Sequence, residues 1–335
     1  MSFKRYMKQT FPQLMPIYHR WRHPIRRAKN FLSIPDGVVL MYHRVNPDEF
    51  DPYGTIVSPE NFEAQIAFLK ETYRVVFFSE SWECGEKPFV CITFDDGYVD
   101  NYRYALPILE KYECPATFFV ATEGVGKEKE LWDNDLIRIL INRSAGKDEI
   151  SLFVEDRRYI FPLKQEDMVE RAIYDIHDLL IGLPIDVRSS VIFSMEQQLL
   201  PGLTCRENYR ILNEKEILSI DSSLYGEVGS HGVTHSRLTA LTHREQEKEL
   251  VESKKKLEEI VGHPITLFTY PFGKKGDFSA HTVQALRDVG YIRAATTLTG
   301  QIHIGNVDYF RVPRWNVGNW EQETFRSWLK IFFSS

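Results

Sequence analysis

The sequence has no hydrophobic run long enough to cross a membrane or to form the core of a signal peptide. Cysteine is scarce as well: the chain of 335 residues contains four, and none of them forms a CxxC pair. Cys91 and Cys114 stand in apolar, strand-like stretches, so we expect them to be buried free thiols. These absences argue against an integral membrane protein and fit a reducing compartment.

An excess of positive charge is also absent. The formal net charge is -6 at pH 7, and the isoelectric point is near 6.0. This balance argues against nucleic acid as the main partner. The chain is 43% hydrophobic and 26% charged, which is ordinary for a globular protein with a sizeable core.

Acidic residues are missing from the first 33 positions, which are rich in lysine, arginine and aromatic residues. We interpret residues 1–35 as a basic N-terminal leader, either solvated or lying as a cationic surface helix against anionic lipid headgroups. Pro12, Pro16 and Pro24 would interrupt such a helix. We therefore expect a cytoplasmic protein without a transmembrane segment, with peripheral contact to the inner membrane face as the alternative.

Short apolar strands alternate with amphipathic helices over residues 36–122 and 214–335, which is typical of a mostly parallel sheet or barrel. The alternation breaks over residues 123–213, where we predict an inserted, mostly helical lid or substrate-side subdomain. A long charged helix is expected over residues 242–261. We interpret its charges as a solvated face, with leucine and isoleucine side chains turned inward.

Two adjacent carboxylates follow one of the apolar strands. The stretch Phe89–Phe94 leads directly into Asp95, Asp96 and Gly97. In α/β enzymes the site lies at the carboxyl edge of the sheet, where such a strand would place both carboxylates. An Asp-Asp-Gly sequence can also be no more than a turn.

Two histidines follow a second short strand, in the sequence Ser230-His231-Gly232-Val233-Thr234-His235. On a helical turn, residues four apart share one face and can hold one ion. A His-x-x-x-His pair by itself is more often incidental. Two imidazoles, one carboxylate and open water positions together form a common hydrolytic metal site.

The pair of motifs "TFDDG" and "SHGVTH" resembles the first two motifs of the polysaccharide deacetylases, the NodB-homology group of carbohydrate esterases. The resemblance runs from about Val38 to about Val317. It implies a distorted (β/α)7-type barrel of α/β class, with the long insertion described above. It implies that Asp95 is the general base and that Asp96, His231 and His235 hold a divalent metal, Zn²⁺ or else Co²⁺ or Ni²⁺.

The sequence departs from the family pattern at the third motif, which usually reads Arg-x-Pro-Tyr. Here Tyr270, Pro271 and Phe272 occupy that place, so the arginine is missing. Arg314, or else Arg311, is a candidate to replace it beside the base aspartate. The alternative is that both are surface arginines in a loop.

The family's motifs near the carboxyl terminus are not evident either, which leaves the general acid open. His43, at the end of the first strand, resembles a histidine of deacetylases with a permuted strand order. It could protonate the leaving amine, because a barrel brings its first and last strands together. The alternative is a structural histidine bonded to a backbone carbonyl.

The resemblance implies hydrolysis of N-acetyl groups on an acetylated sugar or polysaccharide of the bacterial cell surface. Candidate substrate-binding residues are Tyr98, Tyr270, Pro271 and Trp132, although Trp132 is more simply interpreted as a buried anchor of the insertion. Two alternatives stay open: hydrolysis of another amide or an O-acetyl ester, and a degenerate fold that binds glycan or metal without turnover.

Overall fold

The computed structural model describes residues 35–48, 50–83, 85–154, 156–202 and 204–334. The basic leader predicted for residues 1–35 therefore lies almost entirely outside the described residues. Within the described ranges, no helix is long and apolar enough to cross a membrane.

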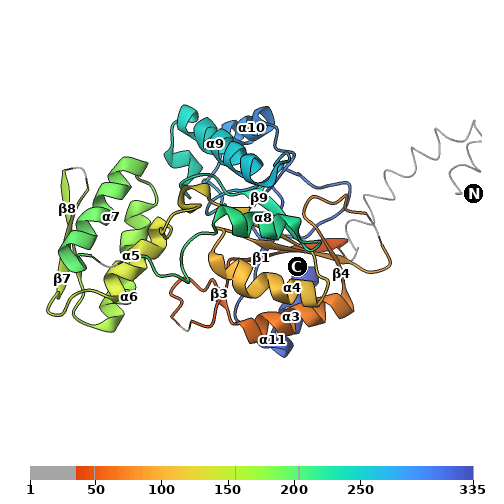
Figure 1. Ribbon diagram of the computed structural model, residues 1–335, viewed down its shortest axis with the longest axis horizontal. Coiled ribbons are helices and arrows are strands. Elements are labelled where there is room, and N and C mark those ends of the chain that lie inside the picture. The colour runs from red at the N-terminus through yellow and green to blue at the C-terminus, as the bar shows by residue number, and fades with distance from the viewer. Residues whose placement is uncertain (1–34, 49, 84, 155, 203, 335) are drawn as a thin grey trace, which may run out of the picture.

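The described chain contains one curled sheet of eight strands in which every pairing is parallel (Figure 1). Their order is β11-β10-β9-β6-β5-β1-β12, and β4 pairs beside the first half of β5. The predicted distorted barrel of α/β class is confirmed. The strands are β1 (Gly37–Tyr42), β4 (Arg74–Val76), β5 (Phe89–Phe94), β6 (Ala116–Val120), β9 (Gly226–Ser230), β10 (Leu267–Thr269), β11 (Arg293–Ala295) and β12 (Trp315–Asn316).

The central strands are hydrophobic along their whole length because the sheet is covered on both faces. Every residue of β1, β5 and β6 is buried, because one face of the sheet packs against helices and the other against an inner cluster of strand and loop side chains. Strand β12 pairs with β1 through Leu40 and Trp315. The first and last strands of the barrel therefore lie side by side, which brings residues near both ends of the described chain to one edge.

Four of the six barrel helices in the described chain begin at a capping side chain. Ser58 caps the first long helix and Pro59 is its first residue, while Thr242 and Glu245 form a capping box at the long charged helix. The barrel helices are α3 (Pro59–Thr72), α4 (Leu106–Lys111), α8 (Glu214–Ser222), α9 (His243–Val261), α10 (Ala280–Val289) and α11 (Gln322–Ser334). Short turns of helix are η2 (Asn101–Ala105), η3 (Thr122–Gly124) and η4 (Leu238–Ala240), and β2 (Arg44–Val45) pairs with β3 (Ile56–Val57).

The predicted insertion folds as three helices packed against a two-stranded hairpin, to one side of the barrel (Figure 1). It has a hydrophobic cluster of its own, separate from the two clusters of the barrel. Alternate residues of the first hairpin strand point into this cluster, and an amphipathic helix covers it. Its elements are α5 (Trp132–Ile141), β7 (Glu149–Val154), β8 (Arg157–Pro162), α6 (Glu166–Leu180) and α7 (Ile185–Leu199).

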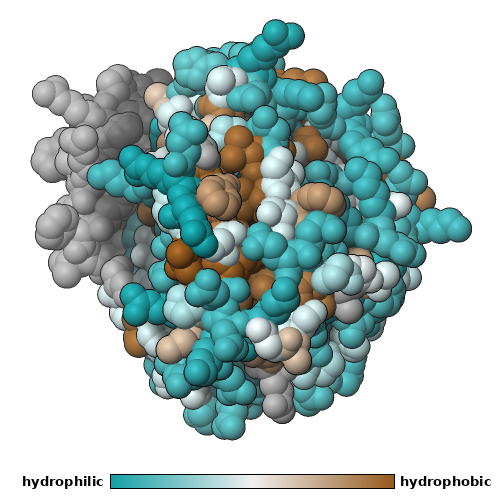
Figure 2. Space-filling view, turned by 90° about the vertical axis from the view of Figure 1, so that its left-hand side faces the viewer, coloured by the Kyte–Doolittle hydropathy of each residue, from teal (hydrophilic) through white to brown (hydrophobic). Residues whose placement is uncertain are grey.

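The outer face of the insertion carries a few apolar side chains among charged ones. Figure 2 shows this side of the molecule, with hydrophobic groups visible between hydrophilic ones. Phe153, Ile160 and Phe193 are more than half exposed there. Scattered exposed apolar residues of this kind are normal for a folded protein.

Candidate active site

A tight turn after β5 carries Asp95 and Asp96. The amide of Asp95 still donates to the carbonyl oxygen of Tyr42 in β1 at 3.0 Å. Asp96 then takes a left-handed φ of 74°, and Gly97 follows with a φ of 82°. A Cβ on Gly97 would lie 2.8 Å from Cγ1 of Val120, so glycine is required here. Because of this turn, the two neighbouring carboxylates reach different partners.

Asp95 is held by a buried arginine from the far end of the sequence. The two terminal guanidinium nitrogens of Arg314 donate to the Asp95 carboxylate, Nη1 to Oδ1 at 2.7 Å and Nη2 to Oδ2 at 2.6 Å. A third nitrogen, Nε, donates to the carbonyl oxygen of Thr296 at 2.9 Å. Burial would raise the pKa of Asp95, but the charge and hydrogen bonds of Arg314 act together with the charges of His231 and His43, and the pKa lies below the ordinary value. The carboxylate is therefore ionised and oriented.

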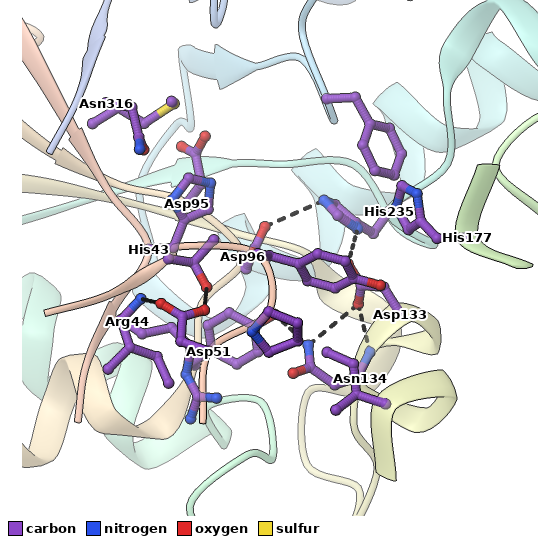
Figure 3. A pocket seen from close by; sticks show the side chains of 18 of the residues that line it. His43, Arg44, Asp51, Asp95, Asp96, Asp133, Asn134, His177, His235 and Asn316 are labelled. Atoms are coloured by element: carbon purple, nitrogen blue, oxygen red, sulfur yellow. Dashed lines mark hydrogen bonds and ion pairs between the residues drawn. The ribbon is translucent and has the colours of Figure 1, made fainter. Parts of the chain in front are cut away.

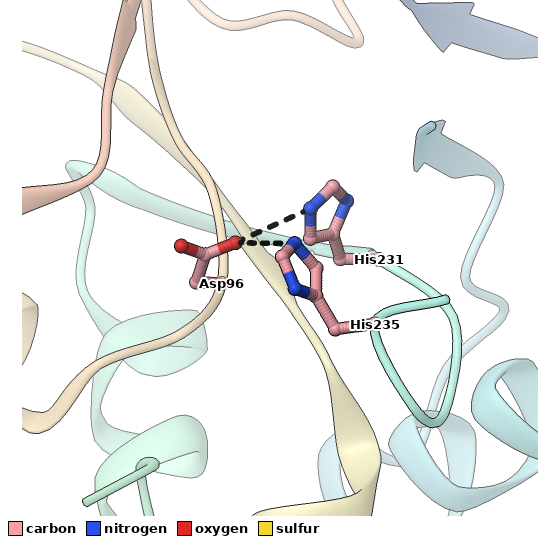
Figure 4. Close-up of side chains that lie close together, drawn as sticks. All are labelled: Asp96, His231 and His235. Carbon is pink, nitrogen blue, oxygen red and sulfur yellow. Dashed lines mark ion pairs between the residues drawn. The ribbon is translucent and has the colours of Figure 1, made fainter. Parts of the chain in front are cut away.

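Asp96 faces both histidines (Figure 4). Its Oδ1 lies 3.3 Å from Nε2 of His231 and 3.3 Å from Nε2 of His235. All three side chains are buried, and their candidate ligand atoms lie within 4.8 Å of one another. Burial would raise the pKa of Asp96, but the imidazoles beside it hold that pKa well below the ordinary value.

The hydrogen bonds of His231 show that this cluster fits a metal ion. Nδ1 of His231 lies 2.8 Å from the carbonyl oxygen of Thr269 and 2.6 Å from its hydroxyl oxygen. The carbonyl oxygen can only accept, so we assign the ring proton to Nδ1. In the neutral ring, Nε2 then presents a lone pair to Asp96 Oδ1, a buried oxygen that has no hydrogen-bond partner. Two electron-rich atoms facing each other in a buried site fit a divalent cation between them.

The two histidines lie on a loop and not on a helical turn, so that part of the sequence argument was wrong. Gly232 has a φ of 77° and His235 a φ of 49°, which are both left-handed conformations. The loop curls back on itself between them and brings both rings to the same side (Figure 4). A tight loop therefore brings the two rings together, and the spacing of four residues does not by itself specify that geometry.

Glu249 of α9 supports this loop, which corrects the expectation that the charges of that helix are all solvated. It is 4% exposed, and its Oε2 accepts from the amides of Val233 at 2.7 Å and Thr234 at 3.0 Å. Its Oε1 accepts from the Thr234 hydroxyl at 2.7 Å. A carboxylate in the middle of a charged helix gives no sequence signal that it points inward.

These groups lie at a cavity of about 390 Å³ between the barrel and the insertion (Figure 3). This volume is in the range of small-molecule sites, which is about 300–1,000 Å³. The barrel contributes His43, Asp95, Asp96, His231 and His235. The insertion contributes Asp133, Asn134, Ile137 and His177.

His43 lines this cavity, half-buried, directly after β1. Its charge interacts with both Asp95 and Asp96, and its buried Nδ1 has no hydrogen-bond partner. The alternative was a structural histidine whose ring bonds to a backbone carbonyl. The structure shows no such bond at Nδ1 of His43. Arg314 is at the site, whereas Arg311 pairs with Asp308 at 2.7 Å on the surface.

Two of the candidate substrate-binding residues do not reach the cavity. Tyr270 is fully buried, and its hydroxyl donates to the carbonyl oxygen of Phe310. Pro271 is buried beside it, and the neighbouring residue that lines the cavity is Phe272. The strand end turns these side chains into the core, so the structure does not place Tyr270 or Pro271 on the cavity wall.

Trp132 and Tyr98 are both largely buried. The indole Nε1 of Trp132 donates to the carbonyl oxygen of His235 at 3.1 Å, and the ring stacks on His177, which itself lines the cavity. Trp132 is thus an anchor of the insertion and not a sugar platform. Tyr98 lines the cavity, and its hydroxyl accepts from Nδ2 of Asn134 at 2.6 Å.

A family model described as polysaccharide deacetylase matches residues 83–145 and 213–294. The two matched segments contain the Asp-Asp-Gly turn and the histidine loop. The gap between them falls within the insertion.

Two curated relatives give different coverage. YxkH of Bacillus subtilis (strain 168), itself provisionally assigned as a polysaccharide deacetylase, is 23% identical over 269 residues, covering 78% of this chain. Poly-beta-1,6-N-acetyl-D-glucosamine N-deacetylase of Staphylococcus aureus (strain MSSA476) is 35% identical over 112 residues, or 32% of this chain. These matches span 64% and 36% of the lengths of those relatives.

Solved structures share the fold at low identity. IcaB from Ammonifex degensii superposes with a TM-score of 0.57 at 18% identity, covering 90% of this chain and 98% of that one. BC0361, a polysaccharide deacetylase from Bacillus cereus, gives 0.55 at 23% identity, covering 87% of this chain and 67% of that one. Family model, relatives and fold agree: this chain belongs to the polysaccharide deacetylase family.

Proposed function

We propose that this protein is a metal-dependent hydrolase that removes N-acetyl groups from an acetylated sugar or glycan. The observation that carries the proposal is the joint placement of two differently partnered carboxylates in one cavity. Asp95 is ionised and held by Arg314, whereas Asp96 forms a three-residue metal cluster with His231 and His235. A base beside a metal site is the arrangement that hydrolysis of an unactivated amide requires.

Asp95 acts as the general base in this proposal. Asp96, His231 and His235 would hold a divalent ion, which would supply Lewis acidity toward the water and the acetyl carbonyl. The Asp95 carboxylate accepts the proton of the attacking water. Arg314 keeps that carboxylate in one orientation, and backbone N–H groups near Tyr98 stabilise the charge that develops on the carbonyl oxygen.

His43 acts as the general acid. Its ring lines the cavity that Asp95 and Asp96 also line. As the C–N bond breaks, the imidazolium donates its proton to the leaving nitrogen. The products are acetate and a free amino sugar. The amine keeps the proton from His43, and loss of the water proton from Asp95 to solvent with reprotonation of His43 restores both groups.

We propose Zn²⁺ as the metal, because two imidazoles and one carboxylate with open positions are its usual hydrolytic ligand set, and Co²⁺ or Ni²⁺ as substitutes. The staphylococcal relative acts, by its name, on poly-beta-1,6-N-acetyl-D-glucosamine. A surface glycan or its precursor is the substrate class that we propose by this likeness.

Acetate release from a panel of N-acetylated sugars and glycans tests the proposal. Metal-stripped protein would be assayed with and without Zn²⁺, Co²⁺ or Ni²⁺, beside Asp95→Asn and the exposed control Asp288→Asn. We expect release that depends on added metal, disappears in Asp95→Asn and persists in Asp288→Asn. Release from O-acetyl esters alone would move the assignment to an esterase. Tight metal binding without release from any compound would favour a binding module.

A further inference from the structure

The insertion contacts the histidine loop directly, through two of its three helices. Trp132 at the start of α5 donates from Nε1 to the carbonyl oxygen of His235 at 3.1 Å. Arg188 of α7 donates from Nη2 to the carbonyl oxygen of Thr234 at 3.2 Å and to Oγ of Ser236 at 2.9 Å. These hydrogen bonds hold the chain at His235 itself and at Thr234 and Ser236 on either side of it.

The loop needs such support because His235 is in a strained conformation. Its φ of 49° lies in the left-handed region, which residues other than glycine adopt at a cost in conformational energy. Such a conformation persists only where its surroundings hold it. The carbonyl of His235 is held by Trp132, and the carbonyl before it is held by Arg188.

The rings of the two histidines are oriented from different parts of the molecule. Nδ1 of His231 is hydrogen-bonded to Thr269 of the barrel. Nδ1 of His235 is buried without a hydrogen-bond partner, and Oδ2 of Asp133 lies 3.7 Å away (Figure 3). Asp133 is therefore the acidic group that the insertion presents to the outer nitrogen of this imidazole.

The Asp133 carboxylate is itself fixed in place. Its Oδ1 accepts from the backbone amide of Asn134 at 2.9 Å and from Nδ2 of the same residue at 3.2 Å. This leaves Oδ2 turned toward His235 (Figure 3). Nδ2 of Asn134 also bonds to the Tyr98 hydroxyl, which ties the arrangement back to the barrel.

We infer that Asp133 positions the His235 ring for metal binding, while Trp132 and Arg188 hold the backbone of the histidine loop. The insertion then contributes to the metal centre and does not only cover it. A carboxylate on the outer nitrogen fixes the orientation of the ring and raises its basicity toward a metal on Nε2. Asp133 is a positioning residue in this role. The inference rests on the proposed metal site of the preceding section.

Metal affinity of the metal-stripped protein tests this inference without any substrate. Zn²⁺ would be titrated in competition with a chromogenic chelator, for the unmodified protein and for Asp133→Asn, Asp133→Glu and Asp135→Asn. Asp135 is the matched control, because it lies on the same helix but pairs with Arg138 at 2.9 Å. We expect Asp133→Asn to bind Zn²⁺ about 10–100-fold more weakly. Asp133→Glu should recover part of the loss, and Asp135→Asn should bind as the unmodified protein does.

The visible absorption of bound Co²⁺ separates positioning from a general loss of structure. We expect Asp133→Asn to change the position or intensity of the Co²⁺ bands while the thermal midpoint of the metal-free protein stays the same. Arg188→Lys, which keeps the charge but loses the forked contact, is a second variant and should shift the bands in the same way. Its control is Arg171→Lys, an exposed residue of α6.

The outcomes distinguish the inference from the proposal beneath it. If the unmodified protein fails to bind Zn²⁺, or if His231→Ala binds it equally well, the proposed metal site is wrong. If the unmodified protein binds Zn²⁺ and both Asp133→Asn and Arg188→Lys match it in affinity and Co²⁺ spectrum, the metal site stands and the positioning role is overturned.

Discussion

The barrel and the insertion bury their side chains in similar ways but contribute differently to the site. The barrel packs helices on a parallel sheet, and the insertion packs three helices on a hairpin around a hydrophobic cluster of its own. All three atoms of the candidate metal cluster come from the barrel. The insertion reaches the cluster only from outside, through Asp133, Trp132 and Arg188.

In this site, the barrel supplies the candidate ligands and the base, and the insertion supplies residues that hold one of the ligands in place. The barrel residues that face the cavity centre sit directly after strands, where a sheet edge gathers them. The supporting residues of the insertion sit on helices that pack around a separate hydrophobic cluster. An inserted segment can therefore adjust a metal centre without supplying a ligand.

The largest expected effect is on the barrel side, at the buried pair of Asp95 and Arg314. Arg314→Met would leave the Asp95 carboxylate buried without its partner, which costs about 3–5 kcal/mol of the free energy of unfolding. Deacetylase activity should disappear with it. Urea denaturation measures the change. Arg311→Met is the control and should cost no more than about 1 kcal/mol, because its partner Asp308 is exposed. Equal losses in the two variants would contradict the buried role of Arg314.

The two separate cores can be compared with one substitution in each. Ile173→Ala in the insertion and Leu257→Ala in the barrel both remove fully buried side chains and should each cost about 2–5 kcal/mol. Hydrogen exchange would locate the damage. We expect faster exchange confined to the insertion for Ile173→Ala, with weaker Zn²⁺ binding. Faster exchange across the barrel in that variant would show that the two cores unfold as one unit.

The pH dependence of stability probes the barrel carboxylate on its own. The pKa of Asp95 is lower in the folded protein than its ordinary value, so the folded state holds this proton less tightly than the unfolded state. The resulting stabilisation is complete above the ordinary pKa of aspartate, about 3.9, and is lost as the pH falls through the lower folded pKa. Unfolding of metal-free protein across that range should show a smaller acid loss for Asp95→Asn. An unchanged acid loss would mean that other groups account for it.

The smallest effect is expected at the insertion side of the cavity. His177 lines the cavity and stacks on Trp132 at a ring-centroid distance of 5.3 Å. If it packs against a sugar ring, His177→Ala should raise KM about 2–10-fold with kcat unchanged, as expected for loss of one ring contact. Steady-state kinetics on the preferred glycan measure this. His263→Ala, an exposed histidine paired with Asp221, should change neither constant.

The strands, the helix caps and the candidate ligands could be predicted from local sequence. Buried parallel strands appear in the sequence as apolar runs. The residues directly after them lie at the carboxyl edge of the sheet, regardless of the conformation of the loops that follow. The tight turn at Gly97 and the capping of the helix after Ser58 follow from the conformations open to glycine, serine and proline. The pairing of Asp95 with Arg314 was one of two open alternatives, because the loop before β12 carries two arginines.

Other features could not be predicted, because they depend on which elements pack together. Glu249 sits among solvated charges, and only the approach of α9 to the histidine loop turns it inward. Tyr270 directly follows β10, just as Asp95 directly follows β5, yet the Tyr270 ring points into the core. Asp133 directly follows Trp132 in the sequence, but its distance to His235 depends on how the insertion docks.

The sequence by itself determined which groups of this protein can do chemistry: two adjacent carboxylates and two histidines at strand ends, in an α/β barrel with an insertion. Side-chain identity and strand periodicity are local properties, and they are sufficient for that conclusion. The tertiary structure alone decided which arginine holds Asp95, that the histidines share a loop, and that the insertion touches His235. The first and last of these relations join residues more than 100 positions apart, Asp95 with Arg314 and His235 with Trp132, and packing sets them.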